Sequence, residues 1–453
     1  MHVTADLSSF HILARLVMAE LPSPSRVRAM DLLPDDLLAD VLTRLPPCSL
    51  AASRCVRKHW CAIIDTRRLL RADLLPLRLD GFFCVLAETP RNYDDDTFCL
   101  FFSRPSTACR INADLYILDH CNGLLLIWGV NPYVINPATR QRVPLPPFPE
   151  ITRQWVHFKS FFFLAYDPMV SPHYEVVLIP VPRTGANNIE LKESSEWPPS
   201  PFTTQVFSSR KWRWEERSFV REGEAAETIA DMQYHRFEAV YLRGALYVHC
   251  RNGSVMRIAL QNDKYQMIKS PAWNEDLAYY LGKCERVVYF GSLSEENMWP
   301  RFRAWLLNES CGQMEWVLKN DISLQAVVEN FTNVYTDRYS TPWIVNYQDE
   351  SDWVNYQKDV SEVQPEDESD WDFDSGIVLH ETKDKVATDY APMLFLGFHP
   401  YKKIAFFLLS RSSRVVSYHL NTSKVQELGI LDELFSVSSF PYTPCWMALF
   451  ENN

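Results

Sequence analysis

Histidine and cysteine are the residue types of this chain with the widest capacity for chemistry, and their spacing here argues against it. The 11 histidines are dispersed, with none within four residues of another, and the 11 cysteines include no C-x-x-C pair. A helical zinc site needs two histidines on one face, and zinc ribbons and disulfide scaffolds need regularly spaced cysteines. We therefore expect no metal site, no disulfide framework, and thiols that are free and buried.

Catalytic motifs are also missing from the sequence. It contains no G-x-x-x-x-G-K-[ST], G-x-G-x-x-G or G-x-S-x-G string, so phosphate-loop, dinucleotide and nucleophile-elbow sites have no support. The run Asp94, Asp95 and Asp96 is better explained as a solvated loop than as an acid–base site. His120 and His249 are better explained as packing residues within strands. The sequence predicts binding rather than catalysis, and no cofactor.

The composition is that of a globular chain of two or three units. Its 453 residues are 47% hydrophobic, and 26 Phe, 20 Tyr and 14 Trp favour packed strands over long helices. The net charge of −12 argues against a nucleic-acid-binding surface. The apolar runs are far too short to cross a bilayer, and the N-terminus has no clean signal peptide. We expect neither nucleic acid nor membrane as a partner, and a location in the cytoplasm or nucleus.

Residues 31–70 hold the strongest helical signals. Pro34 is expected at the first helical position, followed by two acidic residues in the first turn and by Arg44 in the last. Pro46 and Pro47 then end the helix. One apolar stripe at helical spacing comprises Leu37, Leu38, Val41, Leu42 and Leu45.

A second helical run follows, with Ser49 as a plausible cap. Periodicity allows either one long helix or two short ones. About forty residues are too few to bury both stripes, so the surplus must pack against the rest of this chain or against a partner. The apolar positions of the second run are Leu50, Val56, Trp60, Ile63 and Ile64.

This segment resembles an F-box, the adaptor-binding module of cullin-based ubiquitin ligases. The matching landmarks are Leu33-Pro34, Leu37, Val41-Leu42, Leu45-Pro46, Ser49-Leu50, Arg54-Cys55-Val56, Lys58 and Trp60, and Arg57 is a departure that affects only local packing. The resemblance implies a small three-helix module that binds a Skp-family adaptor, and through it cullin and RING subunits. The implied adaptor-binding residues, some of which must instead hold the helices together, are Leu33, Pro34, Leu37, Val41, Leu42, Leu45, Leu50, Val56 and Trp60.

From Gly81 onward the sequence changes to short apolar runs separated by turn residues, which predict strands of a closed or radially repeated β body. Examples are GFFCVLA, YEVVLIP, ALYVHC and IAFFLLS. Asn122-Gly123 and Asn136-Pro137-Ala138-Thr139 are turn signals. Loose repetition of one several-stranded unit favours a propeller, with roughly six to eight blades at a period of ~40–50 residues.

A second resemblance supports this prediction. RLDGFF, CNGLLLIWGVNPYVINPATRQRVPLPP and VFSSRKWRWEER resemble, in this order along the chain, segments of the F-box-associated β domains of large plant families. They imply an architecture and not a particular target.

One stretch interrupts the strand pattern. Residues 345–376 are strongly acidic, and the tripeptide Asn-Tyr-Gln and the tetrapeptide Glu-Ser-Asp-Trp each occur twice in them. We expect an expanded surface loop, because loops tolerate insertions that strands do not. Deletion of residues 348–374 is accordingly expected to leave thermal stability nearly unchanged.

The expected fold is therefore an α+β multidomain chain, with a small all-α F-box followed by an all-β, propeller-like domain. The expected bounds are 1–30 for a flexible extension, 31–72 for the F-box, 73–80 for a linker and 81–453 for the β domain. The expected function is that of a non-catalytic, substrate-recognition subunit of an SCF-type ubiquitin ligase. Two alternatives stay open: a propeller-type scaffold outside a ligase, and an enzyme built on the propeller.

Overall fold

The computed structural model describes the chain at residues 34–45, 49–50, 53–54, 57–67, 69, 78–87, 97–104, 115–129, 131–148, 158–182, 194–225, 228–229, 238–250, 253–271, 278–296, 298–310, 313–331, 341–346, 371–380, 392–431, 437–447 and 449. Leu33, Val56, the Asp94 to Asp96 run and most of the acidic stretch lie outside these residues. None of the described helices is both long and apolar enough to traverse a lipid bilayer.

Residues 34–69 form a helical module with α3 (Asp35–Leu42), α5 (Lys58–Thr66) and helical residues at 49–50 and 53–54. Pro34 is the N-cap of α3, so this helix begins one residue later than predicted. Arg44 lies beyond the last turn and pairs with Asp40 at 2.8 Å. Arg57 is not helical, so the second predicted run is two segments and not one long helix.

The described strands form the six blades of a propeller. Their pairing gives four sheets of four or five strands and one sheet of eight. The eight-stranded sheet divides into two blades where β10 and β14 meet in parallel, whereas strands within a blade are antiparallel.

The first three blades have these bounds. Blade 1 contains β25 (Val437–Tyr442), β1 (Gly81–Ala87), β2 (Thr97–Ser103) and β19 (Ile344–Asn346). Blade 2 contains β3 (Ile117–Cys121), β4 (Leu124–Ile127), β5 (Tyr133–Asn136) and β6 (Gln141–Pro144). Blade 3 contains β7 (Phe158–Ala165), β8 (Glu175–Pro182), β9 (Phe202–Ser208) and β10 (Arg213–Glu222).

The other three blades follow in chain order. Blade 4 contains β11 (Ala239–Leu242), β12 (Ala245–Cys250), β13 (Ser254–Ala259) and β14 (Lys264–Lys269). Blade 5 contains β15 (Ala278–Cys284), β16 (Val287–Glu296), β17 (Trp299–Asn308) and β18 (Glu315–Ser323), and α6 (Gln325–Phe331) follows it. Blade 6 contains β21 (Met393–Phe398), β22 (Ile404–Leu409), β23 (Arg414–His419) and β24 (Lys424–Ile430), with η5 (Phe373–Ser375) beside it and β20 (Ile377–Val378) at its edge.

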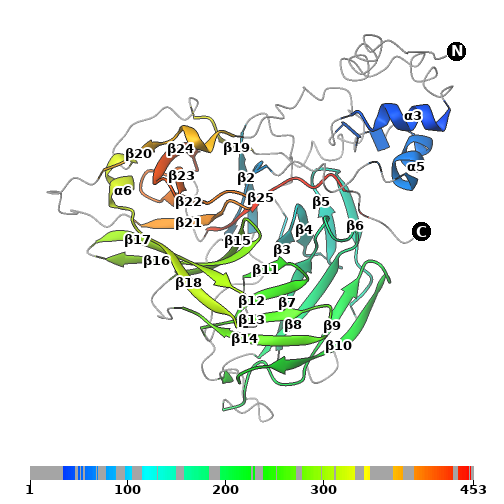
Figure 1. Ribbon diagram of the computed structural model, residues 1–453, viewed down its shortest axis with the longest axis horizontal. Helices are drawn as coiled ribbons and strands as arrows, with labels where there is room; N and C mark the ends of the chain where they lie inside the picture. Colours follow the sequence, from blue (N-terminus) through cyan, green and yellow to red (C-terminus); the bar gives the residue numbers. More distant parts are fainter. Residues whose placement is uncertain are drawn as a thin grey trace, which may run out of the picture.

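The ring is closed by blade 1, which joins the two ends of the propeller sequence. Its innermost strand β25 pairs with β1, with Phe440 opposite Phe83. On its other side the ring of Phe440 stacks on that of His120 in β3, with 3.8 Å between centroids. In Figure 1 the red strand β25 accordingly lies with the blue strand β2 of the same blade.

Aromatic side chains fill the space between neighbouring blades, which accounts for their abundance in the composition. Phe302 of blade 5 stacks on Phe395 of blade 6 at 5.0 Å, and Phe407 meets Phe302 edge-on at 5.1 Å. Such pairs add to the hydrophobic stabilisation that burial itself supplies.

The propeller has two different ends. One end, here the turn end, holds the short turns 122–123, 285–286 and 399–403, which lie close together: Lys283 Nζ donates to Asn122 Oδ1, and the Glu285 N–H donates to the Pro400 carbonyl at 3.0 Å. The helical module lies at this end, because Ala138 in the turn after β5 packs against its core. Figure 1 shows α3 and α5 beside β5 and β6.

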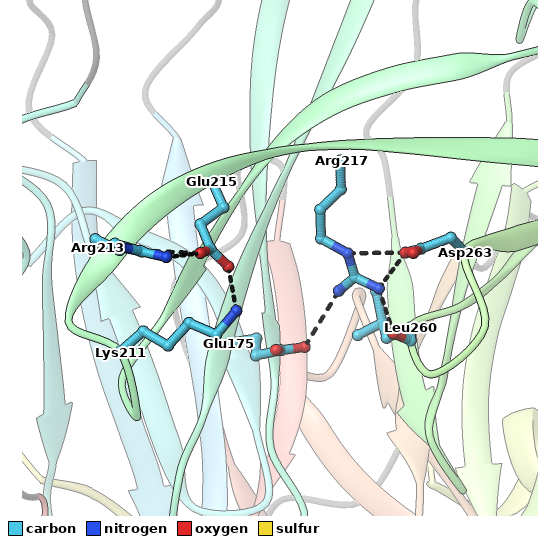
Figure 2. Close-up of polar contacts among 7 residues, drawn as sticks. All are labelled: Glu175, Lys211, Arg213, Glu215, Arg217, Leu260 and Asp263. Carbon is cyan, nitrogen blue, oxygen red and sulfur yellow. Dashed lines mark hydrogen bonds and ion pairs between the residues drawn. The ribbon is translucent and has the colours of Figure 1, made fainter.

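Blades 3 and 4 are fastened to each other by the side chain of Arg217 (Figure 2). Its Nε donates to Asp263 Oδ1 at 2.9 Å, and it also donates to the Leu260 carbonyl and lies 4.0 Å from Glu175. Directly alongside, Val220 to Glu222 pair in parallel with Lys264 to Gln266. The two blades therefore form one continuous sheet.

Most predicted strands are confirmed, and GFFCVLA is β1 to the residue. The expectation of a surface loop for residues 345–376 is wrong at the ends of the stretch. Phe373 is 3% exposed and packs edge-on against Phe406 at 5.5 Å, and residues 344–346 form β19. One end is part of the β body because it pairs with β2, and the other because Phe373 packs in the core.

Candidate adaptor-binding surface

Helix α3 has one buried and one exposed face. Leu38 and Leu42 are fully buried, whereas Leu37 is 52% exposed. Residues 38 and 42 lie one turn apart on the same side of the helix, and residue 37 points about 100° away from residue 38. The helix thus presents a leucine to solvent beside a buried apolar row.

Four of the predicted adaptor-binding residues lie inside the module. They share one hydrophobic cluster, in which they pack against the inward faces of α3 and α5. A charged substitution such as Leu42→Asp would disrupt this core and does not isolate adaptor binding. The four are Leu42, Leu45, Leu50 and Trp60.

The remaining predicted residues divide into two groups. Pro34 and Leu37 are exposed, and Val41 is half-buried against the cluster. Leu33 and Val56 lie outside the described residues. The structure therefore brings together Pro34, Leu37 and Val41 as the part of the predicted set on the outer surface of α3.

Polar and charged side chains lie beside this apolar strip and connect the first turn of α3 to α5 and the residue after it. Asp36 pairs with Arg67 at 2.6 Å and Asp35 with His59 at 3.3 Å, so the first turn of α3 is tied to α5. Exposed pairs of this kind add little stability. Their arrangement around Leu37 gives an apolar centre with a polar rim, which is the usual composition of a protein–protein interface.

The chain's own C-terminus covers another part of the module. Trp446 is 8% exposed and belongs to the same hydrophobic cluster as Leu38, Leu42 and Trp60, with Met447 packed against it. The hypothesis that the surplus apolar surface packs against the rest of this chain is therefore correct for the inner face of the helical module. Sequence reasoning missed the contact, because residues 443–449 carry no periodicity that separates a helix-binding segment from a strand end.

A cavity of about 360 Å³ lies where the first strands of blades 1, 2, 4, 5 and 6 converge. The Asp119 carboxylate accepts the Leu164 N–H at 2.6 Å, and the Glu238 carboxylate accepts the Leu281 N–H at 2.8 Å. The first bond joins β3 to β7, and the second joins the residue before β11 to β15, so each links two neighbouring blades. Among the described residues no cluster of three or more His, Cys, Asp or Glu is arranged to hold a metal ion.

The predicted packing roles of the two strand histidines are confirmed. His120 stacks on Phe440, and His249 is 8% exposed with its ring 5.6 Å from that of Phe290. No disulfide bond joins any of the seven cysteines that the structure describes. Burial raises the pKa of the Cys121 thiol to about 12 and that of Cys445 to about 11, so both are protonated at neutral pH.

Comparisons with known proteins agree with this architecture. The family described as KIB1-4 beta-propeller matches residues 98–357, and the F-box domain family matches residues 30–72. The chain is 22% identical over 360 residues to F-box protein At5g07610 of Arabidopsis thaliana, which is 71% of this chain and 79% of that protein. It is 27% identical over 180 residues to F-box only protein 8 of the same plant, which is 36% of this chain and 59% of that protein. The propeller extends past the family match at both ends, to β1 and β25.

Proposed function

Because the chain belongs to the plant F-box proteins with a KIB1-4 β-propeller, we propose that it is the substrate-recognition subunit of an SCF-type ubiquitin ligase. The F-box would bind a Skp-family adaptor, and through it cullin and RING subunits, while the propeller would hold the target protein. The chain itself would form no covalent intermediate. Its contribution would be proximity, because a tethered target is presented at high effective concentration to the charged ubiquitin-conjugating enzyme. Such a complex would work in the cytoplasm or nucleus.

The observation that carries this proposal is the exposure of Leu37. A leucine with 52% of its surface in solvent, on a helix whose inner leucines are fully buried, is not needed by the core of the module. Because about half of this side chain is already covered, burying the rest in an interface contributes roughly half of the 1.5–3 kcal/mol that complete burial of a leucine supplies. We assign direct adaptor contact to Pro34, Leu37 and Val41, and a supporting role to the four core residues. Leu33 and Val56 remain part of the proposed set.

The test is a charged substitution at Leu37. In Leu37→Asp we expect adaptor affinity to fall by about tenfold or more, because a carboxylate would take the place of a buried apolar anchor. Isothermal titration with a purified Skp-type adaptor measures the change. The matched control is Leu318→Asp, since Leu318 is 47% exposed on the outermost strand of blade 5.

The control variant should bind the adaptor like the unaltered chain. If Leu37→Asp and the unaltered chain bind the adaptor with equal affinity, and circular dichroism shows both to be folded, then α3 is not part of the adaptor interface. Equal weakening by both substitutions would show a general effect of added charge, and it would also contradict the assignment.

A further inference from the structure

The C-terminal strap, defined as residues 443–447 and 449, bridges the propeller and the F-box. We propose that this strap completes the hydrophobic core of the F-box and fixes the F-box to the turn end of the propeller. Adaptor binding then depends on a residue just over 400 positions away in the sequence. The adaptor part of this inference rests on the function proposed above, whereas the docking of the F-box does not.

The strap is held on blade 2 by hydrogen bonds between side chains of blade 2 and the backbone of the strap. Asn136 Nδ2 donates to the carbonyls of Cys445 at 2.8 Å and Met447 at 2.7 Å. Gln141 Oε1 accepts the Leu449 N–H at 2.8 Å. Two side chains at opposite ends of one turn thus bind both carbonyl and N–H groups of the strap.

Asn136 is suited to this role because its amide group both donates and accepts. It is fully buried, and its Oδ1 accepts the N–H groups of Ala138 at 3.1 Å and Thr139 at 3.4 Å. The carbonyl side of the amide therefore shapes the β5–β6 turn, and the NH₂ side holds the strap. An aspartate would keep the first function and lose the second, since an ionised carboxylate has no donor.

The turn between β3 and β4 lies directly beneath the strap. Gly123 has φ +86°, and a Cβ added to it would lie 2.6 Å from Cys445 Cβ and 2.6 Å from the Thr443 carbonyl oxygen. Glycine at this position allows both the left-handed turn and the close approach of the strap.

Successive side chains of the strap point into two different cores. Cys445 and Leu449 belong to the cluster between blades 2 and 3, whereas Trp446 belongs to the cluster of the F-box helices. Alternation of this kind is expected of an extended chain. Trp446 is therefore the side chain through which the propeller reaches the inner face of α3 and α5.

The F-box needs such a contribution. A helical segment of some forty residues buries too little surface for independent stability. Trp446 is among the largest side chains of the cluster, and it packs with Leu38 and Leu42 on the inner face of the helix whose outer face carries Leu37. Loss of Trp446 should therefore loosen α3 and displace the adaptor-binding strip.

The experiment compares Trp446→Ala with the unaltered full-length chain in two measurements. Titration with a purified Skp-type adaptor should show affinity reduced by about tenfold, as expected for loss of a large buried aromatic side chain. Limited trypsin digestion should show faster cleavage between residues 67 and 78, which separates the F-box from the propeller. The matched control is Trp305→Ala, because Trp305 is 7% exposed in blade 5 and remote from the strap. It should change neither readout.

The outcomes separate this inference from the proposed function. Faster cleavage of Trp446→Ala in a protein whose unaltered form binds no adaptor would support the strap and reject the ligase function. Unchanged cleavage and unchanged adaptor affinity in Trp446→Ala would overturn the strap. If Trp446→Ala does not fold, Asn136→Asp is the variant to test. Faster cleavage of this variant supports the proposal that the strap fixes the F-box to the propeller, and a cleavage rate equal to that of the unaltered chain refutes it.

Discussion

Leu37 and Leu38 are sequence neighbours on one predicted apolar stripe, yet their surroundings are opposite. Leu38 is fully buried against the helices and the strap, whereas half of Leu37 is in solvent. An apolar stripe inferred from sequence spans more than 100° of the helix surface. It does not distinguish residues at the centre of the stripe, which are buried, from residues at its edge, which are exposed. The sequence therefore located the helix that we propose as the adaptor-binding element, while the division into core and surface residues required the structure.

The buried thiols give a prediction at the same scale. Burial raises the pKa of Cys121 to about 12 and of Cys445 to about 11, and only the thiolate reacts with iodoacetamide. At pH 8 in the native protein we therefore expect Cys61, which is half-buried, to be alkylated well before Cys121 and Cys445. Peptide mapping by mass spectrometry measures the order.

The unfolded chain in urea is the control for thiol reactivity, and there all three cysteines should react at similar rates. Native alkylation of Cys121 or Cys445 as fast as that of Cys61 would show that the centre of blade 2 opens readily to solvent.

At the scale of elements, the contact between blades 3 and 4 depends on Arg217 (Figure 2). Arg217→Ala would leave the Glu175 carboxylate, whose pKa burial already raises, without its nearest cation, and would release Asp263. We expect a loss of about 1–3 kcal/mol in the free energy of unfolding. Urea denaturation followed by tryptophan fluorescence measures it.

Arg213 provides the matched control for this change. It also pairs with a glutamate, Glu215, but its side chain is 67% exposed. Arg213→Ala should stay within about 0.5 kcal/mol of the unaltered chain. Equal destabilisation by the two substitutions would mean that Arg217 does not fasten the blades.

The acidic stretch gives a second prediction for an element. Replacing residues 348–370 by a short Gly-Ser linker should leave the melting temperature nearly unchanged, because loops tolerate such changes. Extending the replacement through residue 374 removes Trp371, which donates to Gln426 at 3.1 Å, and the buried Phe373. We expect this longer replacement to cost about 3–5 kcal/mol.

Differential scanning calorimetry compares the two replacements. A large drop in melting temperature for the shorter one would place part of residues 348–370 in the β body. Equal melting temperatures for both would show that the packing of Phe373 contributes nothing to stability.

The sequence predicted the strands that carry continuous apolar runs and missed several that line the propeller axis. β15 contains Lys283 and Gly282, and β25 contains Ser438, Ser439 and a proline. These strands border the central cavity, so polar side chains replace the hydrophobic run that marks a fully buried strand. The turn at Asn136 was predicted from local sequence. The hydrogen bonds from its side chain to the carbonyls of residues 445 and 447 span about 310 positions, and no local sequence pattern encodes them.

At the scale of the whole molecule, the strap connects the closed ring of the propeller to the F-box. Blade 1 ties the N-terminal strand β1 to the C-terminal strand β25, and the strap continues from β25 into the F-box core. The F-box lies at the turn end of the propeller (Figure 1). Such a connection is what the function proposed above would require, since a substrate receptor must hold its target near the rest of the ligase.

The most direct test of this account is assembly of the unaltered chain with a purified Skp-type adaptor, cullin and RING subunit, followed by sedimentation velocity. The account predicts one complex that contains a single copy of each protein. A folded chain that sediments alone, with adaptor present at concentrations on the order of tens of micromolar, would contradict it.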